Sequence, residues 1–136
     1  MKRQDILENQ AKIVFLGIGS NLGQRKTNIE KAKFLLAEFN LDFLSVSSYY
    51  ETPSWPDPRK PKFLNIILKI RCNYNPQELL KICKSIETQL GRKKAKKNAP
   101  RTCDLDIIDF NKLVSKKNSR VNLPHKMMHK RNFVLF

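Results

Sequence analysis

Two aspartates near the end of the chain form a pattern that suits a metal ion. Asp104 and Asp106 are two positions apart in residues 102–110, an apolar segment that predicts a β-strand. Side chains two apart on a strand point to the same face, so both carboxylates project together while Leu105 faces the other way. Paired carboxylates repel each other unless a cation joins them, and Mg²⁺ prefers oxygen ligands. The pattern fits a Mg²⁺ site, and it fits equally well an exposed strand face that merely carries two aspartates.

A strongly basic segment lies directly before this strand. Six of the ten residues in 92–101 are basic: Arg92, Lys93, Lys94, Lys96, Lys97 and Arg101. Such side chains can bind a polyphosphate and disperse the charge of a transferring phosphoryl group. The planar guanidinium of Arg101 suits contact with two phosphate oxygens. A solvated lysine run and a nucleic-acid surface are the alternatives, because a formal net charge of +15 implies only some anionic partner.

An aromatic side chain and an amide share one face of an earlier predicted strand, residues 63–72. The apolar residues Leu64, Ile66 and Leu68 alternate with the others and predict the buried face. Phe63 and Asn65 then lie on the open face, where stacking and hydrogen bonding suit a flat heterocycle. The alternative is an exposed aromatic ring beside an asparagine near a turn.

The elements that must position these residues follow a β-α-β-β-α-β order. Predicted strands span residues 12–18, 41–52, 63–72 and 102–110, and predicted helices span about 25–39 and 76–90. Residues 19–23 are predicted to form a turn, and the prolines of residues 53–61 predict a long loop. This order predicts a ferredoxin-like α+β fold, an antiparallel sheet with helices on one face and the substrate site on the other. We expect a disordered lead-in at 1–11 and one domain at 12–136.

Composition narrows the class of protein. Hydrophobic residues make up 40% of the chain, which is typical of a globular domain, and no apolar run of about 18 residues predicts a membrane span. The cysteines, Cys72, Cys83 and Cys103, form no Cys-x-x-Cys pair. They indicate buried thiols in a reducing compartment, so we expect a cytoplasmic protein. The Gly-x-Gly at residues 17–19 is not followed by the third glycine of a dinucleotide fingerprint or by a Walker lysine.

The segment Lys97–Ile108 resembles the signature of the 6-hydroxymethyl-7,8-dihydropterin pyrophosphokinase family: basic, any, small, Pro, Arg, two free positions, Asp, aliphatic, Asp, two aliphatics. The resemblance extends over about residues 12–136 and includes Gly-Ser-Asn-Leu-Gly at 19–23, Tyr-Glu-Thr-Pro at 50–53, Phe-Leu-Asn at 63–65 and Leu-Pro-His at 123–125. It departs from the family at Asn98-Ala99, where many members have Trp-Gly. Relatives usually continue beyond Phe136, so we expect a shortened C-terminus.

This resemblance implies transfer of pyrophosphate from ATP to the hydroxymethyl group of the pterin, with release of AMP, in folate biosynthesis. It implies two Mg²⁺ ions on Asp104 and Asp106, and it assigns catalysis to these aspartates with Arg92 and Arg101. The implied pterin site comprises Thr52, Pro53, Trp55 as a lid, Phe63, Asn65 and Phe133. The implied ATP site comprises Glu87, Arg92, Lys94, Lys97, Arg101, Ile107, Arg120, His125 and Arg131.

The expected partners are therefore the two small substrates, with no nucleic acid and no membrane, and the expected state is a monomer. Two other functions stay open at this point. A small nucleic-acid-binding domain fits the charge and the sheet aromatics. A non-catalytic relative that only binds nucleotide would fit the fold.

Overall fold

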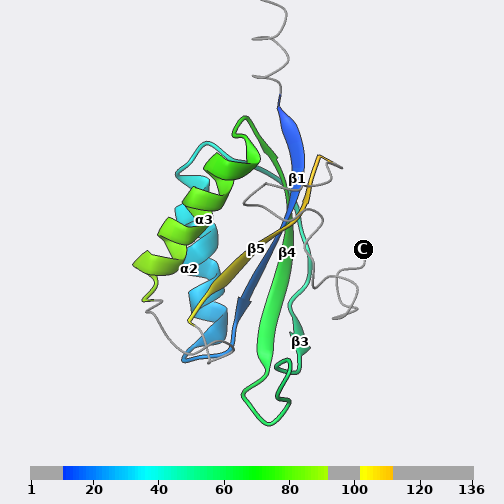
Figure 1. Cartoon of the computed structure of the whole chain (residues 1–136), viewed down its shortest axis with the longest axis vertical. Helices are drawn as coiled ribbons and strands as arrows, with labels where there is room; N and C mark the ends of the chain where they lie inside the picture. The colour runs from blue at the N-terminus through cyan, green and yellow to red at the C-terminus, as the bar shows by residue number, and fades with distance from the viewer. Residues whose placement is uncertain (1–10, 92–101, 112–136) are drawn as a thin grey trace, which may run out of the picture.

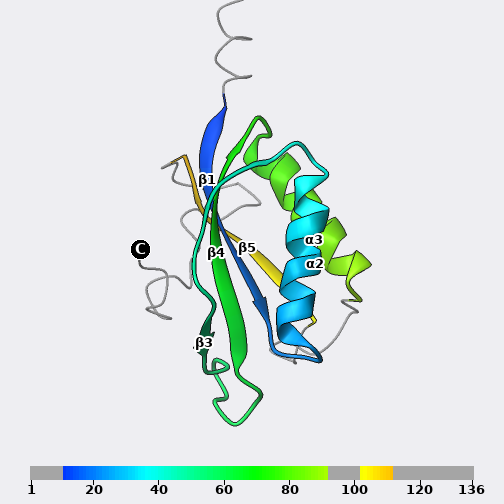
Figure 2. The same ribbon diagram turned by 180° about the vertical axis from the view of Figure 1, so that it is seen from behind.

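The computed structural model describes residues 11–91 and 102–111, and it contains one antiparallel sheet with two helices packed on one face. The strands are β1 (Lys12–Ser20), β2 (Asp42–Val46), β3 (Tyr50–Thr52), β4 (Phe63–Cys72) and β5 (Asp104–Phe110); the helices are α2 (Arg25–Ala37) and α3 (Pro76–Gln89). The sheet order is β2-β4-β1-β5, and β3 also pairs with β4. Figures 1 and 2 show both helices on the same side of the sheet. The predicted ferredoxin-like α+β fold is confirmed.

The central strands β1 and β4 form because their residues alternate between two environments. They pair in one continuous antiparallel register from Lys12↔Cys72 to Ser20↔Leu64. The members that face the helices are almost completely buried and form the core with residues of α2, α3 and β5: Val14, Leu16, Ile18, Ile66, Leu68 and Ile70. Burying these branched side chains between sheet and helices is the main force that stabilises the domain.

Local signals set the ends of α3 as predicted. The Asn75 Oδ1 accepts a hydrogen bond from the Glu78 backbone N–H at 2.8 Å, and Glu78 Oε1 accepts one from the Asn75 backbone N–H at 2.9 Å. This capping box satisfies two backbone donors that the helix leaves unpaired. Gly91 follows the helix with a φ of +94°, a left-handed conformation that glycine adopts without strain.

The first helix and the predicted strand 41–52 differ from expectation in their bounds. Helix α2 ends at Ala37 rather than Phe39, because the Phe39 backbone N–H turns to the Leu36 carbonyl at 3.0 Å. The strand is split into β2 and β3, which both pair with β4. Between them Ser47 Oγ accepts from the Ile67 backbone N–H at 2.8 Å. A side-chain oxygen thus replaces the main-chain acceptor there, and the regular ladder stops.

Several predictions lie outside the described residues: the lead-in at 1–10, the basic segment 92–101 and the C-terminal region 112–136. All three cysteines are free and buried, as predicted. Neither described helix is long and apolar enough to cross a membrane.

Candidate active site

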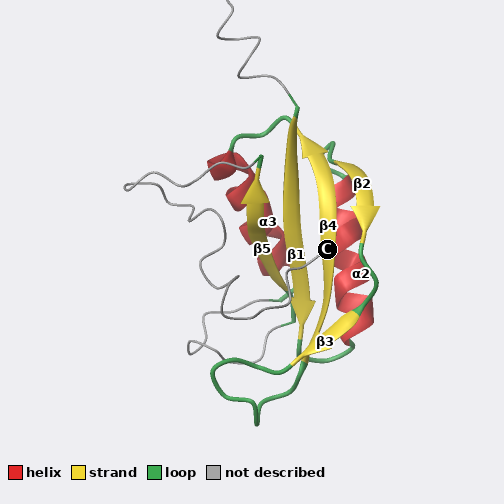
Figure 3. Ribbon diagram, turned by 90° about the vertical axis from the view of Figure 1, so that its right-hand side faces the viewer, coloured by secondary structure: helices red, strands yellow, loops and turns green. Residues whose placement is uncertain are grey.

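The face of the sheet opposite the two described helices, here called the helix-free face, faces the viewer in Figure 3. It carries a row of residues that crosses four strands. Asp104 of β5 pairs with Gly19 of β1, Gly19 pairs with Asn65 of β4, and Asn65 pairs with Tyr50 of β3. Their neighbours along the strands, Ile18, Leu64 and Leu105, pack in or against the core on the helix side. The row therefore faces away from the helices, because successive side chains alternate between faces.

The two aspartates project from the same face, as the alternation predicts. Asp106 pairs with Gly17 and Asp104 with Gly19, while Leu105 and Ile107 lie in the core. The carboxylates therefore stand beside two glycines that present no side chain. Asp104 is buried and Asp106 is half-buried.

The donor chemistry of this pair fits Mg²⁺. In the described ranges, no group of three His, Cys, Asp or Glu side chains is placed to hold a metal ion. Two hard carboxylates are nevertheless the usual protein share of a Mg²⁺ site that substrate phosphates and waters complete. The pair is suited to a metal ion that arrives with a nucleotide rather than to a closed all-protein cage.

Glu87 of α3 is tied to the strand that carries the aspartates. Its side chain is 1% exposed, and its Oε2 accepts a hydrogen bond from the Leu105 backbone N–H at 2.8 Å. The Lys84 Nζ lies 3.5 Å from Glu87 Oε1 and offsets part of the cost of burying that charge. Glu87 thus fixes the backbone between Asp104 and Asp106; its predicted contact with ATP stays a prediction.

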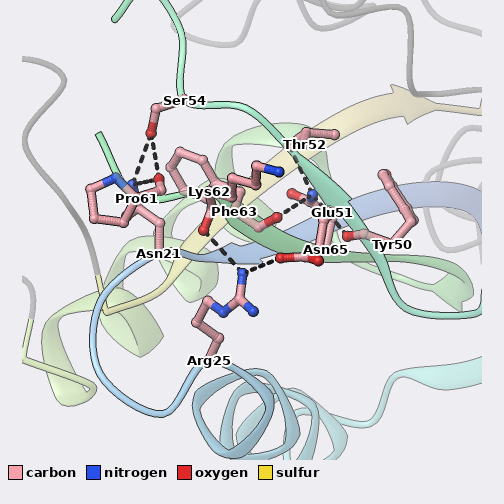
Figure 4. Close-up of polar contacts among 10 residues, drawn as sticks. All are labelled: Asn21, Arg25, Tyr50, Glu51, Thr52, Ser54, Pro61, Lys62, Phe63 and Asn65. Carbon is pink, nitrogen blue, oxygen red and sulfur yellow. Dashed lines mark hydrogen bonds and ion pairs between the residues drawn. The ribbon is translucent and has the colours of Figure 1, made fainter. Parts of the chain in front are cut away.

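Asn65 has its amide orientation set by three acceptors. Its Nδ2 lies 3.2 Å from the Tyr50 carbonyl, 3.0 Å from Thr52 Oγ1 and 3.4 Å from the Phe63 carbonyl (Figure 4). Because the NH₂ side is occupied in this way, the carbonyl Oδ1 is directed toward Gly19. A Cβ added at Gly19 would lie 2.9 Å from that Oδ1 and 3.2 Å from Phe63 Cδ1. The ring of Phe63 and the amide oxygen of Asn65 therefore flank the bare backbone of Gly19.

Tyr50 completes the row on the far side of Asn65, and sequence reasoning did not select it. Burial raises the pKa of its phenol from 10.0 to about 12. Burial thus further disfavours the charged form of this phenol, which lies at the β3 end of the row. Its position in the Tyr-Glu-Thr-Pro motif at residues 50–53 was the sequence feature that could have identified it.

The remaining predicted residues of this face lie at the end of β3 and in the loop between β3 and β4, residues 53–62. Thr52 ends β3 opposite Phe63, Pro53 is exposed, and Trp55 is 46% exposed. Two buried residues were missed: Ser54 near the start of this loop, and Asn21 in the turn between β1 and α2. No local pattern marks a contact between distant turns. Ile107 lies in the core, and its predicted contact with ATP stays a prediction.

Eight predicted site residues lie outside the part of the chain that the structure describes: Arg92, Lys94, Lys97, Arg101, Arg120, His125, Arg131 and Phe133. Their roles stay predictions. The described residues bring together the aspartate pair, Gly19, Phe63, Asn65 and Thr52.

Comparisons with known proteins agree on one family. The sequence model of 7,8-dihydro-6-hydroxymethylpterin-pyrophosphokinase (HPPK) matches residues 15–136. The 2-amino-4-hydroxy-6-hydroxymethyldihydropteridine pyrophosphokinase of Aquifex aeolicus (strain VF5) is 37% identical over 123 residues, which cover 90% of this chain and 76% of the relative. The enzyme of the same name from Bacillus subtilis (strain 168) is 37% identical over 124 residues, 90% of this chain and 74% of the relative. The mitochondrial folate synthesis bifunctional protein of Arabidopsis thaliana is 33% identical over 122 residues, 90% of this chain and 22% of the relative.

Proposed function

The chain belongs to the 7,8-dihydro-6-hydroxymethylpterin-pyrophosphokinase family, which transfers a pyrophosphoryl group to hydroxymethyldihydropterin in folate biosynthesis, and we propose that it takes this group from ATP with the help of Mg²⁺. The observation that carries the proposal is the row on the helix-free face. Carboxylates suited to a nucleotide-bound cation stand on one side of Gly19, and groups suited to a flat heterocycle stand on the other.

On the phosphate side, Asp104 and Asp106 would hold Mg²⁺. The ion would neutralise phosphate charge and help to orient the phosphates for displacement. The protein would hold the two carboxylates in fixed positions, because the Glu87 carboxylate accepts a hydrogen bond from the backbone N–H of Leu105, which lies between the two aspartates. Arg92, Arg101, His125 and Arg131 are proposed to bind the triphosphate, with Lys94, Lys97 and Arg120 in support.

On the pterin side, the amide oxygen of Asn65 is proposed to accept hydrogen bonds from the N–H groups of the heterocycle. Its orientation supports this role, because the Asn65 NH₂ group is already directed to protein acceptors. Phe63 would stack on the ring, with Phe133 on its other face. Gly19 lets Phe63 and Asn65 take these positions, since an added Cβ there would lie 2.9 Å from Asn65 Oδ1 and 3.2 Å from Phe63 Cδ1.

The spacing of the row suits a transfer between two substrates. Adjacent strands are about 4.8 Å apart, so β5 and β4 are separated by roughly 10 Å across β1. A pterin over β4 could then extend its hydroxymethyl arm toward phosphates over β5. Catalysis of this kind depends on positioning and charge neutralisation rather than on a covalent nucleophile.

The test is a turnover assay with purified protein. Formation of AMP from ATP should require both Mg²⁺ and 6-hydroxymethyl-7,8-dihydropterin, and chelation by EDTA should stop it until Mg²⁺ is restored. Salt-sensitive binding of RNA or DNA without any turnover would instead favour a nucleic-acid-binding domain and contradict the proposal.

A further inference from the structure

The turn between β1 and α2 grips both ends of the loop that connects β3 to β4. The Asn21 Nδ2 donates to Ser54 Oγ at 3.1 Å and to the Pro61 carbonyl at 3.1 Å. The Ser54 Oγ in turn donates to the same carbonyl at 2.8 Å. Figure 4 shows these contacts as a small triangle, here called the loop clasp: Asn21, Ser54 and Pro61.

The loop clasp is buried, although it links surface loops. Asn21 is 4% exposed and Ser54 is 6% exposed. A buried amide or hydroxyl is costly without partners, so these groups favour the one loop arrangement in which both are satisfied. Four prolines between positions 53 and 61 remove backbone donors from the loop. Side-chain bonds therefore take over the anchoring that a strand ladder provides elsewhere.

A second, exposed contact secures the same hairpin from outside. The Arg25 Nη1 donates to Glu51 Oε2 at 2.9 Å and to the Lys62 carbonyl at 3.2 Å. Because this ion pair is open to solvent, water and salt weaken it. The buried loop clasp is consequently the stronger candidate for setting the loop's position.

We propose that Asn21 is a positioning residue for pterin binding. It holds the loop so that the stretch from Thr52 to Trp55 lies in place beside Phe63 and Asn65. This inference rests on the proposed function, because it concerns the same pterin site. The aspartates stand on β5, on the other side of β1 from the loop, so release of the loop should leave handling of ATP nearly intact.

The expected loss of pterin affinity follows from the fraction of molecules in which the loop is in its binding position. If loss of the loop clasp leaves the loop in its pterin-binding position for only about a tenth of the time, the apparent affinity for pterin falls about tenfold. Loss of two hydrogen bonds between neutral groups is enough for such a shift.

The main test is the substitution Asn21→Asp, which keeps the shape of the side chain and removes both donors. We expect KM for pterin to rise about tenfold, while kcat and KM for ATP change less than about twofold. Trp55 is the only tryptophan of the chain and directly follows Ser54. Its fluorescence in the ligand-free protein should become more accessible to quenching by acrylamide.

Asn28→Asp is the matched control. The Asn28 Nδ2 donates to Ser20 Oγ at 3.2 Å and to the Leu22 carbonyl at 2.9 Å, so its described bonds stay next to the turn and do not reach the loop. This variant should leave pterin KM and Trp55 quenching close to those of the unchanged protein.

Several results would overturn the inference: unchanged pterin KM and quenching in Asn21→Asp, or equal increases in KM for both substrates. A similar response in Asn28→Asp would count against it as well. If Asn21→Asp does not fold, Ser54→Ala is judged by the same criteria. If the unchanged protein shows no turnover, the proposed function fails, while the quenching comparison still decides whether the loop clasp holds the loop.

Discussion

Gly19 is the residue on which the open face of the sheet depends most directly. It lies between Asp104 and Asn65 in the row. Because it has no side chain, Asn65 Oδ1 and the Phe63 ring can lie close to its backbone. Its role comes from close approach of neighbouring groups rather than from an unusual backbone conformation.

Gly19→Ala should raise KM for pterin by at least about tenfold, because overpacking a fixed site costs about 1–3 kcal/mol. KM for ATP should change much less. Steady-state kinetics with each substrate varied in turn, and calorimetric titration with pterin, measure both effects. Gly17→Ala is a milder comparison, since its added Cβ meets only the flexible end of Ile108, at 3.1 Å. Equal losses in the two variants would argue against a specific role for Gly19.

Asp106→Asn removes a charge from the aspartate pair and keeps its shape. We expect kcat to fall at least about a hundredfold, because the charge proposed to hold the cation and, through it, the phosphates is lost. Circular dichroism should show an unchanged fold. Asp109→Asn is the control, because Asp109 lies farther along β5, opposite Phe15. Near-normal turnover of Asp106→Asn at low Mg²⁺ would refute the metal assignment.

At the scale of elements, α3 both supports the core and fixes the backbone of β5, the strand that carries Asp104 and Asp106. Its apolar residues Leu79, Cys83 and Ile86 are fully buried, and Glu87 from the same helix bonds to the backbone of β5. Anything that loosens α3 therefore acts first on stability and only indirectly on the aspartates.

Asn75→Ala should destabilise the domain by about 1 kcal/mol, the usual cost of losing an N-cap side chain. Activity per folded molecule should stay close to normal, since the cap is at the end of α3 away from Glu87. Urea unfolding measures the loss, with Asn73→Ala as an exposed asparagine outside the capping box. Equal stability of the two variants would show that the cap contributes little.

The whole molecule combines two layers with a strongly positive surface. Both described helices lie on one side of the sheet, as Figures 1 and 3 show together, and the proposed substrate site is on the opposite side. The net charge of +15 attracts anionic substrates and also makes the folded chain repel itself. Salt screens both effects, so it should stabilise the folded chain and at the same time weaken the binding of anionic substrates.

Raising NaCl from about 20 to about 200 mM should therefore increase the thermal midpoint and at the same time increase KM for ATP, because screening weakens both repulsion and attraction. Differential scanning fluorimetry and kinetics over the same series provide the two curves. KM for the uncharged pterin serves as the internal control and should change little. A thermal midpoint that falls with salt would contradict self-repulsion as the main effect of the net charge on stability.

The element order, the cap of α3 and the shared face of Asp104 and Asp106 could be predicted, because each depends on residues a few positions apart. Strand alternation and helix capping are properties of the local chain, so they can be read without knowing the fold. The family signature, too, is one continuous segment.

Which distant groups meet was decided by the tertiary packing alone. Asn21 and Ser54 are 33 positions apart, and Glu87 lies 18 positions before Leu105. The strand break at Ser47 depends on Ile67 of the neighbouring strand. Such contacts form only when sheet register and helix packing bring the partners together, and no local pattern carries that information.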